Sequence, residues 1–459
     1  MKISNLLDTK YDFSITGITD DSRDVKKGFV FVATKGFHVD HFEFIHKAIE
    51  NGCVFLVVDK EIDFSFPHKV VKNINDYYQE LCIKFYQVNL SSFHFFGVTG
   101  TDGKTTTSTI LSKLIDNCSY IGTNGVTFSD IHLSTNNTTP CVSEFYQDLK
   151  MIEDHSISNV SMEVSSEALL HERVSKILFD IVMITNITGD HFNIHKDFED
   201  YKNTKLKILN LLKEDGILLV NGDDDNLSSL KKENLYTIGF SKNCDYYIKE
   251  VCYKERKTII TLCYQDKSII LESPYIGKFN VYNLVFAYVG ALLYGVGEDT
   301  LIEKIKNLSP ISGRCEFLDF QQNFDIVLDY AHTINGIQSI LNTFKDRRII
   351  TVCGCAGGRD SSKRRKIGKL LMDKSSVAIF TMDDPRWEDV NQIIDEMVGE
   401  DSNYIRIINR RVAICYALQK AKSGDVVLIL GKGRDNYMAI QDRKDNYSDY
   451  EVVKDYFLG

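Results

Sequence analysis

The residues best suited to chemistry form a glycine-rich turn at 97–105, which reads Gly-Val-Thr-Gly-Thr-Asp-Gly-Lys-Thr. An apolar run precedes it and a helical pattern follows, so we predict a strand, a turn and a helix in that order. Backbone N–H groups at Gly100 and Gly103 would face phosphate oxygens, and Lys104 would reach the β/γ end. The Thr105 hydroxyl would ligate Mg²⁺. The turn therefore predicts a site for a nucleoside triphosphate.

A carboxylate follows a second strand in the same part of the chain. Glu163 stands just after the β-prone run Ile157–Val160. At the carboxyl end of a parallel strand it would face the nucleotide and could ligate Mg²⁺. The alternative is that Glu163 is a solvated surface residue, as most glutamates are. The residue by itself does not decide between this alternative and a Mg²⁺ ligand.

Further ligand-type side chains follow a third apolar strand, Ile181–Ile184. His191 comes shortly after it, and Lys205 lies on a helix that we expect to begin near Phe198. Side chains at successive strand ends converge on one edge of an open sheet, so His191 could share metal ions with Glu163. An ordinary surface histidine and a solvated lysine are the alternatives.

Composition narrows the class of protein. A chain of 459 residues exceeds what one hydrophobic core usually supports, which favours about three domains. We find neither an apolar run long enough to span a membrane nor a signal-peptide pattern, and we expect a cytoplasmic protein without stable membrane association. The 11 cysteines are not paired as CxxC, so we expect neither zinc nor disulfides. The net charge of −10 argues against nucleic-acid binding.

The fold class expected is α/β with three domains. Residues 1–90 alternate short strands and helices without a phosphate loop, which indicates a small substrate-binding domain. Residues 91–308 have the pattern of a mostly parallel sheet with crossover helices, and they would form the nucleotide-binding core. Residues 309–459 repeat the strand and helix alternation, which predicts a third, doubly wound domain.

Taken together, these motifs resemble those of the Mur ligase family, the ATP-dependent amide-forming enzymes of peptidoglycan synthesis. The resemblance runs nearly end to end and is most specific for members that add the third peptide residue. It rests on the phosphate loop, on Glu163 and Lys205, and on these further segments: Asp21-Ser22-Arg23, Gly36 to Asp40, Asn137 to Pro140, Asp190-His191, Gly277 to Asn283, Gly313-Arg314, Asp329 to Thr333, Asp383 to Arg386 and Gly431 to Gly433.

The resemblance implies that residues 91–308 bind ATP and that residues 309–459 bind the amino acid and the nucleotide. It also implies a role for each matching residue. It implies that the catalytic residues are Lys104, Glu163, His191 and Lys205. It implies two Mg²⁺ ions with ligands among Thr105, Glu163, His191 and a carbamoylated Lys205. The residues implied to bind ATP are Gly100, Thr101, Asp102, Gly103, Lys104, Thr105, Thr106, Asn283, Arg314, Asp329 and His332. Those implied to bind the other substrates are Ser22, Arg23, Asn137, Thr138, Thr139, Ser165, Asp383, Asp384, Arg386, Gly431 and Asp435.

The reaction that the resemblance implies has two steps. The free carboxylate of UDP-MurNAc-L-Ala-D-Glu attacks the γ-phosphate of ATP, and a free amino acid then displaces phosphate from the acyl phosphate. Arg386 could grip a second carboxylate, which favours meso-diaminopimelate over L-lysine. Two departures weaken this choice, because Asp384 replaces the usual asparagine and Asp435 the usual glutamate.

Three other hypotheses stay open. A divergent family member could join an amino acid to a different carboxylate acceptor. A P-loop switch or kinase would use the same phosphate loop, but it would not need Lys205. A binding protein without catalysis would not need to keep Lys104, Glu163, His191 and Lys205 together. We expect the protein to act as a monomer.

Overall fold

The computed structural model describes residues 1–34, 41–135, 137–189 and 194–459. The chain divides into two compact units, each made of several segments. The first unit comprises Met1–Ile187, Lys196–Ile238 and Phe286–Val296, and the second comprises Thr188–His195, Gly239–Val285 and Gly297–Gly459. The domain boundaries expected near residues 90 and 308 stay predictions.

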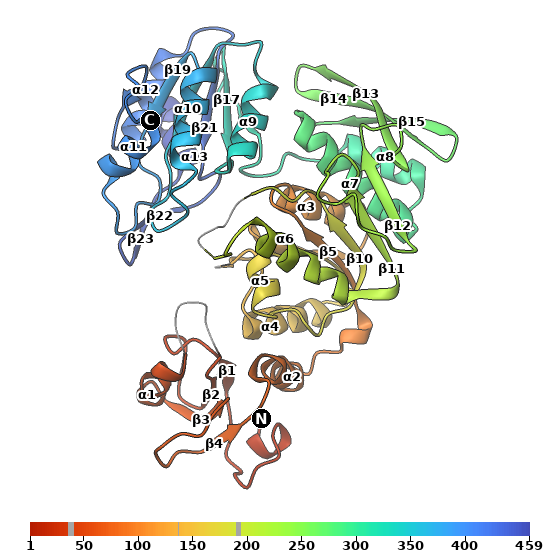
Figure 1. The fold of residues 1–459 in the computed structure, drawn as a ribbon, viewed down its shortest axis with the longest axis vertical. Coiled ribbons are helices and arrows are strands. Elements are labelled where there is room, and N and C mark those ends of the chain that lie inside the picture. Colours follow the sequence, from red (N-terminus) through yellow and green to blue (C-terminus); the bar gives the residue numbers. More distant parts are fainter. Residues whose placement is uncertain (35–40, 136, 190–193) are drawn as a thin grey trace. The chain divides into compact units, whose positions relative to one another are not determined.

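A small parallel sheet opens the first unit, with its strands in the order β1-β2-β3-β4 (Figure 1). Phe31 and the helix α1 share one core cluster, whereas Val30 and Val32 belong to another that includes α2. This division follows from the alternation of side chains along a strand. The elements are β1 (Gly17–Thr19), β2 (Phe29–Val32), α1 (Ile45–Glu50), β3 (Cys53–Val58), β4 (His68–Val70) and α2 (Ile74–Tyr86).

Helix α2 joins this small sheet to the larger part of the first unit by packing against α4 (Val142–Asp154). Two buried hydrogen bonds connect α4 to the strand β1 and to α2. The Ser143 hydroxyl donates to the Ile18 carbonyl at 2.7 Å, and the Tyr146 hydroxyl donates to the Gln79 side chain at 2.9 Å. The contact is therefore specific as well as apolar.

The larger sheet of the first unit has the strand order β12-β11-β10-β5-β9-β6-β7-β8. Strands from β12 to β6 are parallel, and β7 and β8 extend the sheet in antiparallel fashion. From the central β5 the chain first builds one side of the sheet and then the other, so the carboxyl ends of β9, β5 and β10 form a switch point. The strands are β5 (His94–Thr99), β6 (Cys118–Gly122), β7 (Gly125–Phe128), β8 (Ile131–Leu133), β9 (Asn159–Glu163), β10 (Phe179–Ile184), β11 (Leu212–Asn221) and β12 (Leu235–Gly239).

Three helices of this part begin at recognisable capping residues. Gly103, with a φ of 89°, precedes α3. The side chains of Ser165 and Asp197 accept backbone hydrogen bonds at the starts of α5 and α6. The helices are α3 (Lys104–Leu114), α5 (Ser166–Leu170), α6 (Phe198–Leu206) and α7 (Lys278–Tyr294), the last of which crosses the division between the units.

The second unit contains an antiparallel meander and a six-stranded sheet in the order β16-β17-β21-β18-β19-β20, in which only β16 is antiparallel. Helices α9, α10 and α11 pack on one face of this sheet, and α12 and α13 pack on the other. The doubly wound arrangement expected here is thus confirmed. The meander and its helix are β13 (Tyr246–Lys254), β14 (Lys257–Tyr264), β15 (Lys267–Ser273) and α8 (Glu298–Lys306).

The remaining elements of the second unit follow in chain order. They are β16 (Glu316–Leu318), β17 (Asp325–Asp329), α9 (Ile334–Thr343), β18 (Ile349–Cys353), α10 (Arg364–Lys374), β19 (Val377–Phe380), α11 (Val390–Val398), β20 (Ile405–Arg406), α12 (Arg410–Lys420), β21 (Val426–Leu430), the hairpin β22 (Tyr437–Ile440) and β23 (Arg443–Asn446), and α13 (Asp449–Leu458).

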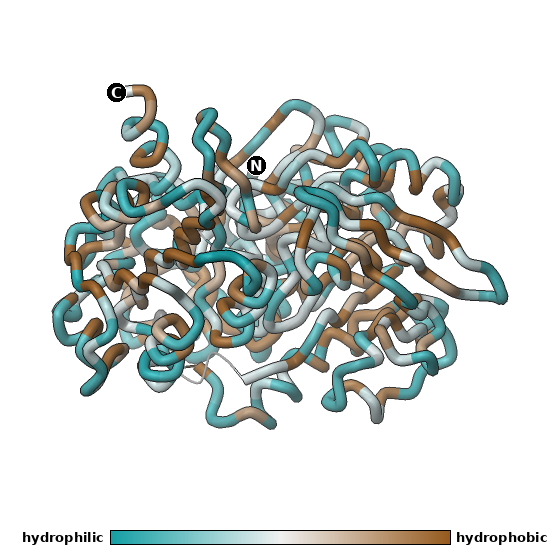
Figure 2. The backbone as a smooth tube through the Cα atoms, turned by 90° about the horizontal axis from the view of Figure 1, so that it is seen from above, coloured by the Kyte–Doolittle hydropathy of each residue, from teal (hydrophilic) through white to brown (hydrophobic). Residues whose placement is uncertain are grey.

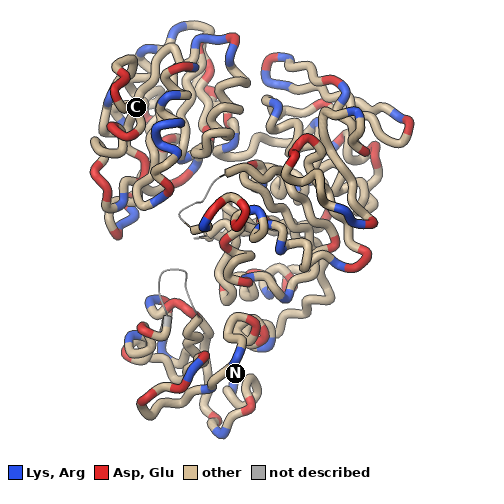
Figure 3. Tube along the Cα trace, viewed as in Figure 1, with Lys and Arg blue, Asp and Glu red and all other residues tan. Residues whose placement is uncertain are grey.

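The distribution of residue types agrees with sheets that are covered by helices. Hydrophobic and hydrophilic stretches alternate along the tube in Figure 2. Acidic and basic residues are interspersed in Figure 3 rather than gathered into one basic tract. None of the helices in the described ranges is long and apolar enough to cross a membrane.

Candidate active site

The phosphate loop connects β5 to α3, as expected. Lys104 is the first residue of α3, and its Nζ donates hydrogen bonds of 2.9 Å to the carbonyls of Gly100 and Thr101. Gly100 has a φ of 150°, and a Cβ there would lie 2.0 Å from the Thr185 hydroxyl. The loop therefore needs glycine at this position. Gly103 precedes α3, and Thr105 and Thr106 lie in its first turn.

A second loop, at the end of β10, holds the phosphate loop in place. The Thr101 N–H donates to the Asn186 carbonyl at 2.9 Å. Asp102 and Asn186 exchange two hydrogen bonds of 3.0 Å between backbone and side-chain amide, and the Thr185 hydroxyl donates to the Asp102 carbonyl at 2.7 Å. Thr185 and Asn186 were not among the expected site residues, although their place after a strand end could have suggested them.

Glu163 ends β9 and is fully buried, so the solvated alternative is wrong. Its Oε1 accepts hydrogen bonds from the Tyr120 hydroxyl at 2.6 Å and the Thr123 N–H at 2.8 Å. Its Oε2 accepts from the Thr105 hydroxyl at 3.0 Å. A Cβ on Gly122 would lie 2.2 Å from the Glu163 carboxylate, so the strand end must lack a side chain there.

The residues expected on the substrate side lie beside this carboxylate. The Thr123 hydroxyl donates to the Thr138 hydroxyl at 3.1 Å. The Thr139 hydroxyl donates to the Glu163 carbonyl at 2.9 Å and accepts from the Ser165 N–H at 3.0 Å. Thr138, Thr139 and Ser165 are therefore brought together with Glu163, as their grouping in one site requires. Asn137 is the next residue along the same segment.

An arginine that was not expected also joins this group. Arg173 donates from Nη1 to the Thr139 carbonyl at 3.2 Å and pairs with Glu167 at 3.4 Å. Its side chain is mostly buried, at 16% exposed, whereas Glu167 is 44% exposed. Arg173 is a cation beside the threonines expected on the substrate side, and its sequence context after a short helix gave no signal for this.

Lys205 is almost completely buried on α6, so the alternative of a solvated lysine is wrong. Its Nζ donates to the Gly100 carbonyl at 2.8 Å and lies 4.7 Å from the centre of the Tyr201 ring. The Tyr201 hydroxyl donates to Thr101 Oγ1 at 3.1 Å. Lys104 and Lys205 thus approach the same phosphate-loop carbonyl from two helices.

Some expected residues cannot be placed in this group. His191, like Asp190 and the motif that runs from Gly36 to Asp40, lies outside the described residues. Across the described ranges, no group of three or more His, Cys, Asp and Glu side chains could hold a metal. Ser22 is buried in the loop after β1, and the neighbouring Arg23 is 85% exposed and pairs with Asp21. These two residues form a separate group in the small sheet.

The expected nucleotide residues of the second unit surround the end of β17. Asp329 Oδ2 accepts a 2.6 Å hydrogen bond from the Cys315 N–H, and its Oδ1 accepts a 2.8 Å bond from a second backbone N–H. The Arg314 guanidinium lies 4.7 Å from the centre of the Tyr330 ring. His332 Nδ1 is 2.9 Å from the Tyr330 carbonyl. Asp329 therefore shapes the loop that carries Arg314.

Asn283 lies on α7, in the second unit, and is buried. Its Nδ2 donates to the Asn280 side-chain carbonyl at 3.3 Å. Its own amide is thus oriented by a neighbour on the same helix.

A buried lysine gathers three carboxylates at the ends of β19 and β21. Lys432 Nζ donates to Asp384 Oδ1 at 2.7 Å and lies 3.8 Å from Asp383 and 3.7 Å from Asp435. The Ala439 N–H also donates to Asp384 Oδ1, at 3.0 Å. Burial raises the pKa of Asp435 to about 6, Lys432 opposes this, and Asp384 and Asp383 reinforce it. The cluster has an excess of negative charge. Gly431, with a φ of 107°, begins the loop that carries Lys432 and Asp435.

A pair of arginines belongs to the same end of the second unit. Burial and then the nearby Arg359 lower the pKa of Arg386. Arg386 has a φ of 52°, and its N–H donates to the Ala439 carbonyl at 3.0 Å. Two guanidinium groups that repel each other stabilise a bound anion. Arg359 was not expected, although the glycines before it indicate a loop after β18.

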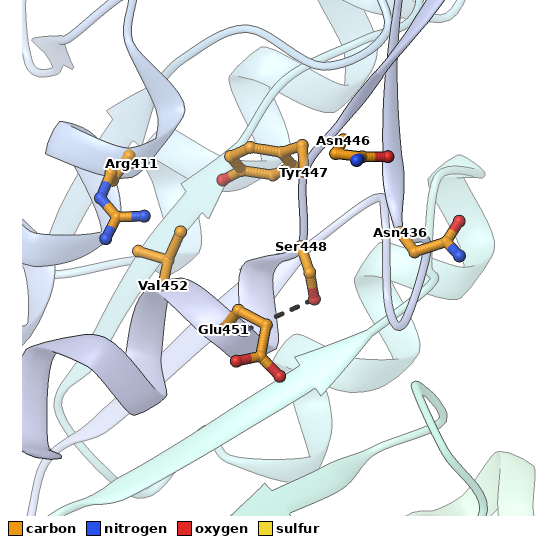
Figure 4. A pocket seen from close by; sticks show the side chains of 7 residues that line it. All are labelled: Arg411, Asn436, Asn446, Tyr447, Ser448, Glu451 and Val452. Carbon is orange, nitrogen blue, oxygen red and sulfur yellow. Dashed lines mark hydrogen bonds between the residues drawn. The ribbon is translucent and has the colours of Figure 1, made fainter.

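One open cavity of about 400 Å³ in the second unit carries none of the expected residues (Figure 4). Figure 4 shows the side chains around it, which come from α12, from the residue before β22, from the end of β23 and the loop after it, and from α13. They are Arg411, Asn436, Asn446, Tyr447, Ser448, Glu451 and Val452. None of these seven residues belongs to the acidic cluster around Lys432 or to the pair of Arg359 and Arg386.

Comparison with known proteins covers most of this chain. Residues 14–89 match the model described as Mur ligase family, catalytic domain. Residues 98–291 match the Mur ligase middle domain, and residues 313–433 match the Mur ligase, glutamate ligase domain. The UDP-N-acetylmuramoyl-L-alanyl-D-glutamate--2,6-diaminopimelate ligase of Bacillus cereus is 33% identical, over 100% of this chain and 99% of the relative.

The chain belongs to the Mur ligase family. A second relative with the same name, from Clostridium botulinum, is 32% identical over 96% of this chain and 95% of its own length. Members of the family are ATP-dependent ligases that form amide bonds, and this Mur ligase is such an enzyme. The hypotheses of a P-loop switch and of a binding protein are therefore wrong.

Solved structures agree with the fold of this Mur ligase. A structure titled UDP-N-acetylmuramoyl-L-alanyl-D-glutamate--2,6-diaminopimelate ligase has a TM-score of 0.65 and 26% identity, over 100% of this chain and 98% of that chain. The MurF ligase of Thermotoga maritima, solved in complex with ADP, has a TM-score of 0.65 and 20% identity over 96% of each chain. The three-domain fold expected from the motifs is confirmed.

Proposed function

We propose that this Mur ligase adds a diamino acid to UDP-MurNAc-L-Ala-D-Glu in peptidoglycan precursor synthesis, with meso-diaminopimelate preferred over L-lysine. The D-glutamate carboxylate attacks the γ-phosphate of ATP, and the amine then displaces phosphate from the acyl phosphate. The enzyme acts mainly by positioning the reactants and neutralising charge. The name shared by full-length relatives at 32–33% identity supports this substrate pair.

The residues around the phosphate loop suit the first step. Lys104 is placed to neutralise the β/γ end of ATP once its loop carbonyl contacts exchange for phosphate oxygens. The Thr105 hydroxyl and the buried Glu163 carboxylate, 3.0 Å apart at the start of α3, are oxygen donors of the kind that Mg²⁺ prefers. They fit the ion and would hold it with His191. Bound Mg²⁺ would offset the charge that develops on the transferred phosphoryl group.

Lys205 suits the carbamate that the family resemblance implies. Its Nζ is buried and directed at the phosphate loop, so two carbamate oxygens on it would be presented to the same place. We propose that this modified side chain holds a second Mg²⁺. A carbamate resonance in the ¹³C NMR spectrum of protein kept in ¹³C-bicarbonate should appear, and it should be missing in Lys205→Arg. A spectrum without this difference would refute the modification.

One observation in particular supports the choice of amino acid. The second unit combines a pair of cationic side chains, Arg359 and Arg386, which could bind an anion, with an acidic cluster that contains Asp384 and Asp435. The distal end of meso-diaminopimelate has both a carboxylate and an ammonium group, whereas that of L-lysine has only the ammonium group. Paired guanidinium groups would therefore add affinity only for the former.

The test is product formation by purified protein with ATP, Mg²⁺ and UDP-MurNAc-L-Ala-D-Glu. Meso-diaminopimelate, L-lysine and L-ornithine are supplied one at a time, and the product is identified by mass. We expect a tripeptide product with meso-diaminopimelate and at least tenfold less with L-lysine. Preference for L-lysine would refute the role of the arginine pair. No product with any amine would favour a different carboxylate acceptor.

The wider setting is also part of this proposal. We expect a cytoplasmic enzyme that works as a monomer, with the small domain 1–90 binding the UDP part through Ser22 and Arg23. Sedimentation at several concentrations would test the oligomeric state. Loss of affinity for the UDP-linked substrate alone in Arg23→Ala would support the role of the small domain.

A further inference from the structure

Arg434 makes an unusually complete set of contacts for a loop residue. Its Nε and Nη2 donate to the two carboxylate oxygens of Glu316 at 2.8 Å and 2.5 Å. Its guanidinium carbon lies 3.6 Å from the centre of the Tyr450 ring. The three residues come from the loop after β21, from β16 and from the first turn of α13. Arg434 therefore joins its loop to two other elements of the second unit.

Glu316 also holds the loop that carries the nucleotide residue Arg314. Its Oε2 accepts a 2.7 Å hydrogen bond from the Gly313 N–H. The two loops touch directly as well, because a Cβ on Gly313 would lie 2.7 Å from the backbone nitrogen of Arg434 and 3.1 Å from Gly433 Cα. With Glu316 only 11% exposed, this bidentate pair is stronger than a surface ion pair.

Arg434 is followed at once by Asp435, in the acidic cluster around Lys432. The Asp435 N–H donates to the Lys432 carbonyl at 2.9 Å, so the turn between them is short and closed. The family resemblance implies a glutamate where this chain has Asp435. An aspartate is one methylene shorter than a glutamate and has fewer rotamers with which to reach a ligand. Its reach therefore depends more on the position of its backbone.

We infer that Arg434 is a positioning residue for the amino-acid substrate. By clamping its loop to Glu316 and Tyr450, it sets where the short Asp435 side chain presents its carboxylate to the distal ammonium group. A displacement of about 1 Å at such a group can cost up to about 100-fold in rate. The inference rests on the proposed function, in which the distal ammonium group of the diamino acid would bind the acidic cluster that contains Asp435.

Arg434→Lys tests this, because lysine keeps the charge but loses the bidentate geometry and the planar stacking. We expect the KM for meso-diaminopimelate to rise about tenfold, with kcat and the KM for ATP within about twofold of the parent enzyme. The matched control is Arg411→Lys, which replaces an exposed arginine paired with Asp455 in the same unit. It should leave all three constants unchanged.

A double variant separates positioning from a general structural role. If Arg434 acts through Asp435, Arg434→Lys combined with Asp435→Asn should have the same KM for meso-diaminopimelate as Asp435→Asn alone. If the increases in KM caused by the two substitutions instead multiply in the double variant, the inference is overturned. An unchanged KM for meso-diaminopimelate in Arg434→Lys would overturn it too.

Amide hydrogen exchange gives a second readout that needs no turnover. Exchange at residues 431–435 of the substrate-free protein should be faster in Arg434→Lys than in the parent or in Arg411→Lys. Unchanged exchange would overturn the clamp even if no amino acid were accepted. If the parent enzyme forms no product with any amine while amide exchange in Arg434→Lys is faster, the result would instead count against the proposed substrate and against the role of Asp435 in binding it.

Discussion

The ionisation of Asp435 should control how tightly the diamino acid binds. Burial raises the pKa of this carboxyl to about 6. Only the carboxylate form attracts an ammonium group, so below pH 6 binding must first release a proton. At pH 5 about one site in eleven is ionised, and we expect binding at this contact to be about tenfold weaker than at pH 8.

The assay is the KM for meso-diaminopimelate from pH 5 to 8, measured by ADP formation at saturating ATP and UDP-linked substrate. Asp435→Asn is the control, because it lacks the titrating carboxyl but shares the ionisation of the reacting amine. The ratio of the KM of the variant to that of the parent should be largest at pH 8 and fall about tenfold by pH 5. A ratio that stays constant with pH would refute the reasoning.

Two further changes test other parts of the molecule. Gly122→Ala would place a Cβ 2.2 Å from a Glu163 oxygen. Because this displaces a hydrogen-bonded carboxylate, kcat should fall about 10- to 100-fold while the circular dichroism spectrum stays unchanged. A loss of kcat below twofold would contradict the role of Glu163. Asp148, on α4, is buried with no hydrogen-bond partner for its Oδ2 in the described structure, and burial followed by Glu144 raises its pKa to about 7. The folded state then binds more protons than the unfolded state between about pH 4 and 7, so stability from this group falls as pH rises through that range. Asp148→Asn should therefore raise the free energy of unfolding by up to about 4 kcal/mol at pH 8 and by almost nothing at pH 4. Urea unfolding of the parent and the variant at both pH values measures this difference. An equal gain in stability at pH 8 and pH 4 would contradict the reasoning.

The parts of the site that could be predicted depend on local sequence or on a general rule of sheets. Strand, glycine turn and Lys104 are neighbours in sequence, so the phosphate loop was predictable from its own residues. The approach of Thr105 to Glu163 followed from the convergence of parallel strand ends. The role of Lys205 needed the family resemblance, because its spacing alone fits an exposed helix face as well.

Other parts depend on contacts between distant residues, which a single sequence does not display. Arg173 and Arg359 lie in loops or after short helices, where no periodic pattern marks them. The bond between Lys432 and Asp384 joins residues 48 positions apart. The antiparallel strand β14 has alternate buried residues, a pattern that fits any half-covered strand, so its place in a meander rather than in a parallel sheet was not predicted.

Thr123 contacts both Thr138 and Glu163, and this limits how such an enzyme can change its acceptor. Its hydroxyl donates to Thr138, a residue expected to contact the acceptor, and the N–H and hydroxyl of Thr123 both lie within hydrogen-bond distance of Glu163. A mutation that reshapes acceptor recognition through Thr138 would thus also disturb the carboxylate proposed to hold the metal. New acceptor preferences should evolve more readily in the small domain than beside Thr123, where each gain in selectivity would carry a loss of turnover.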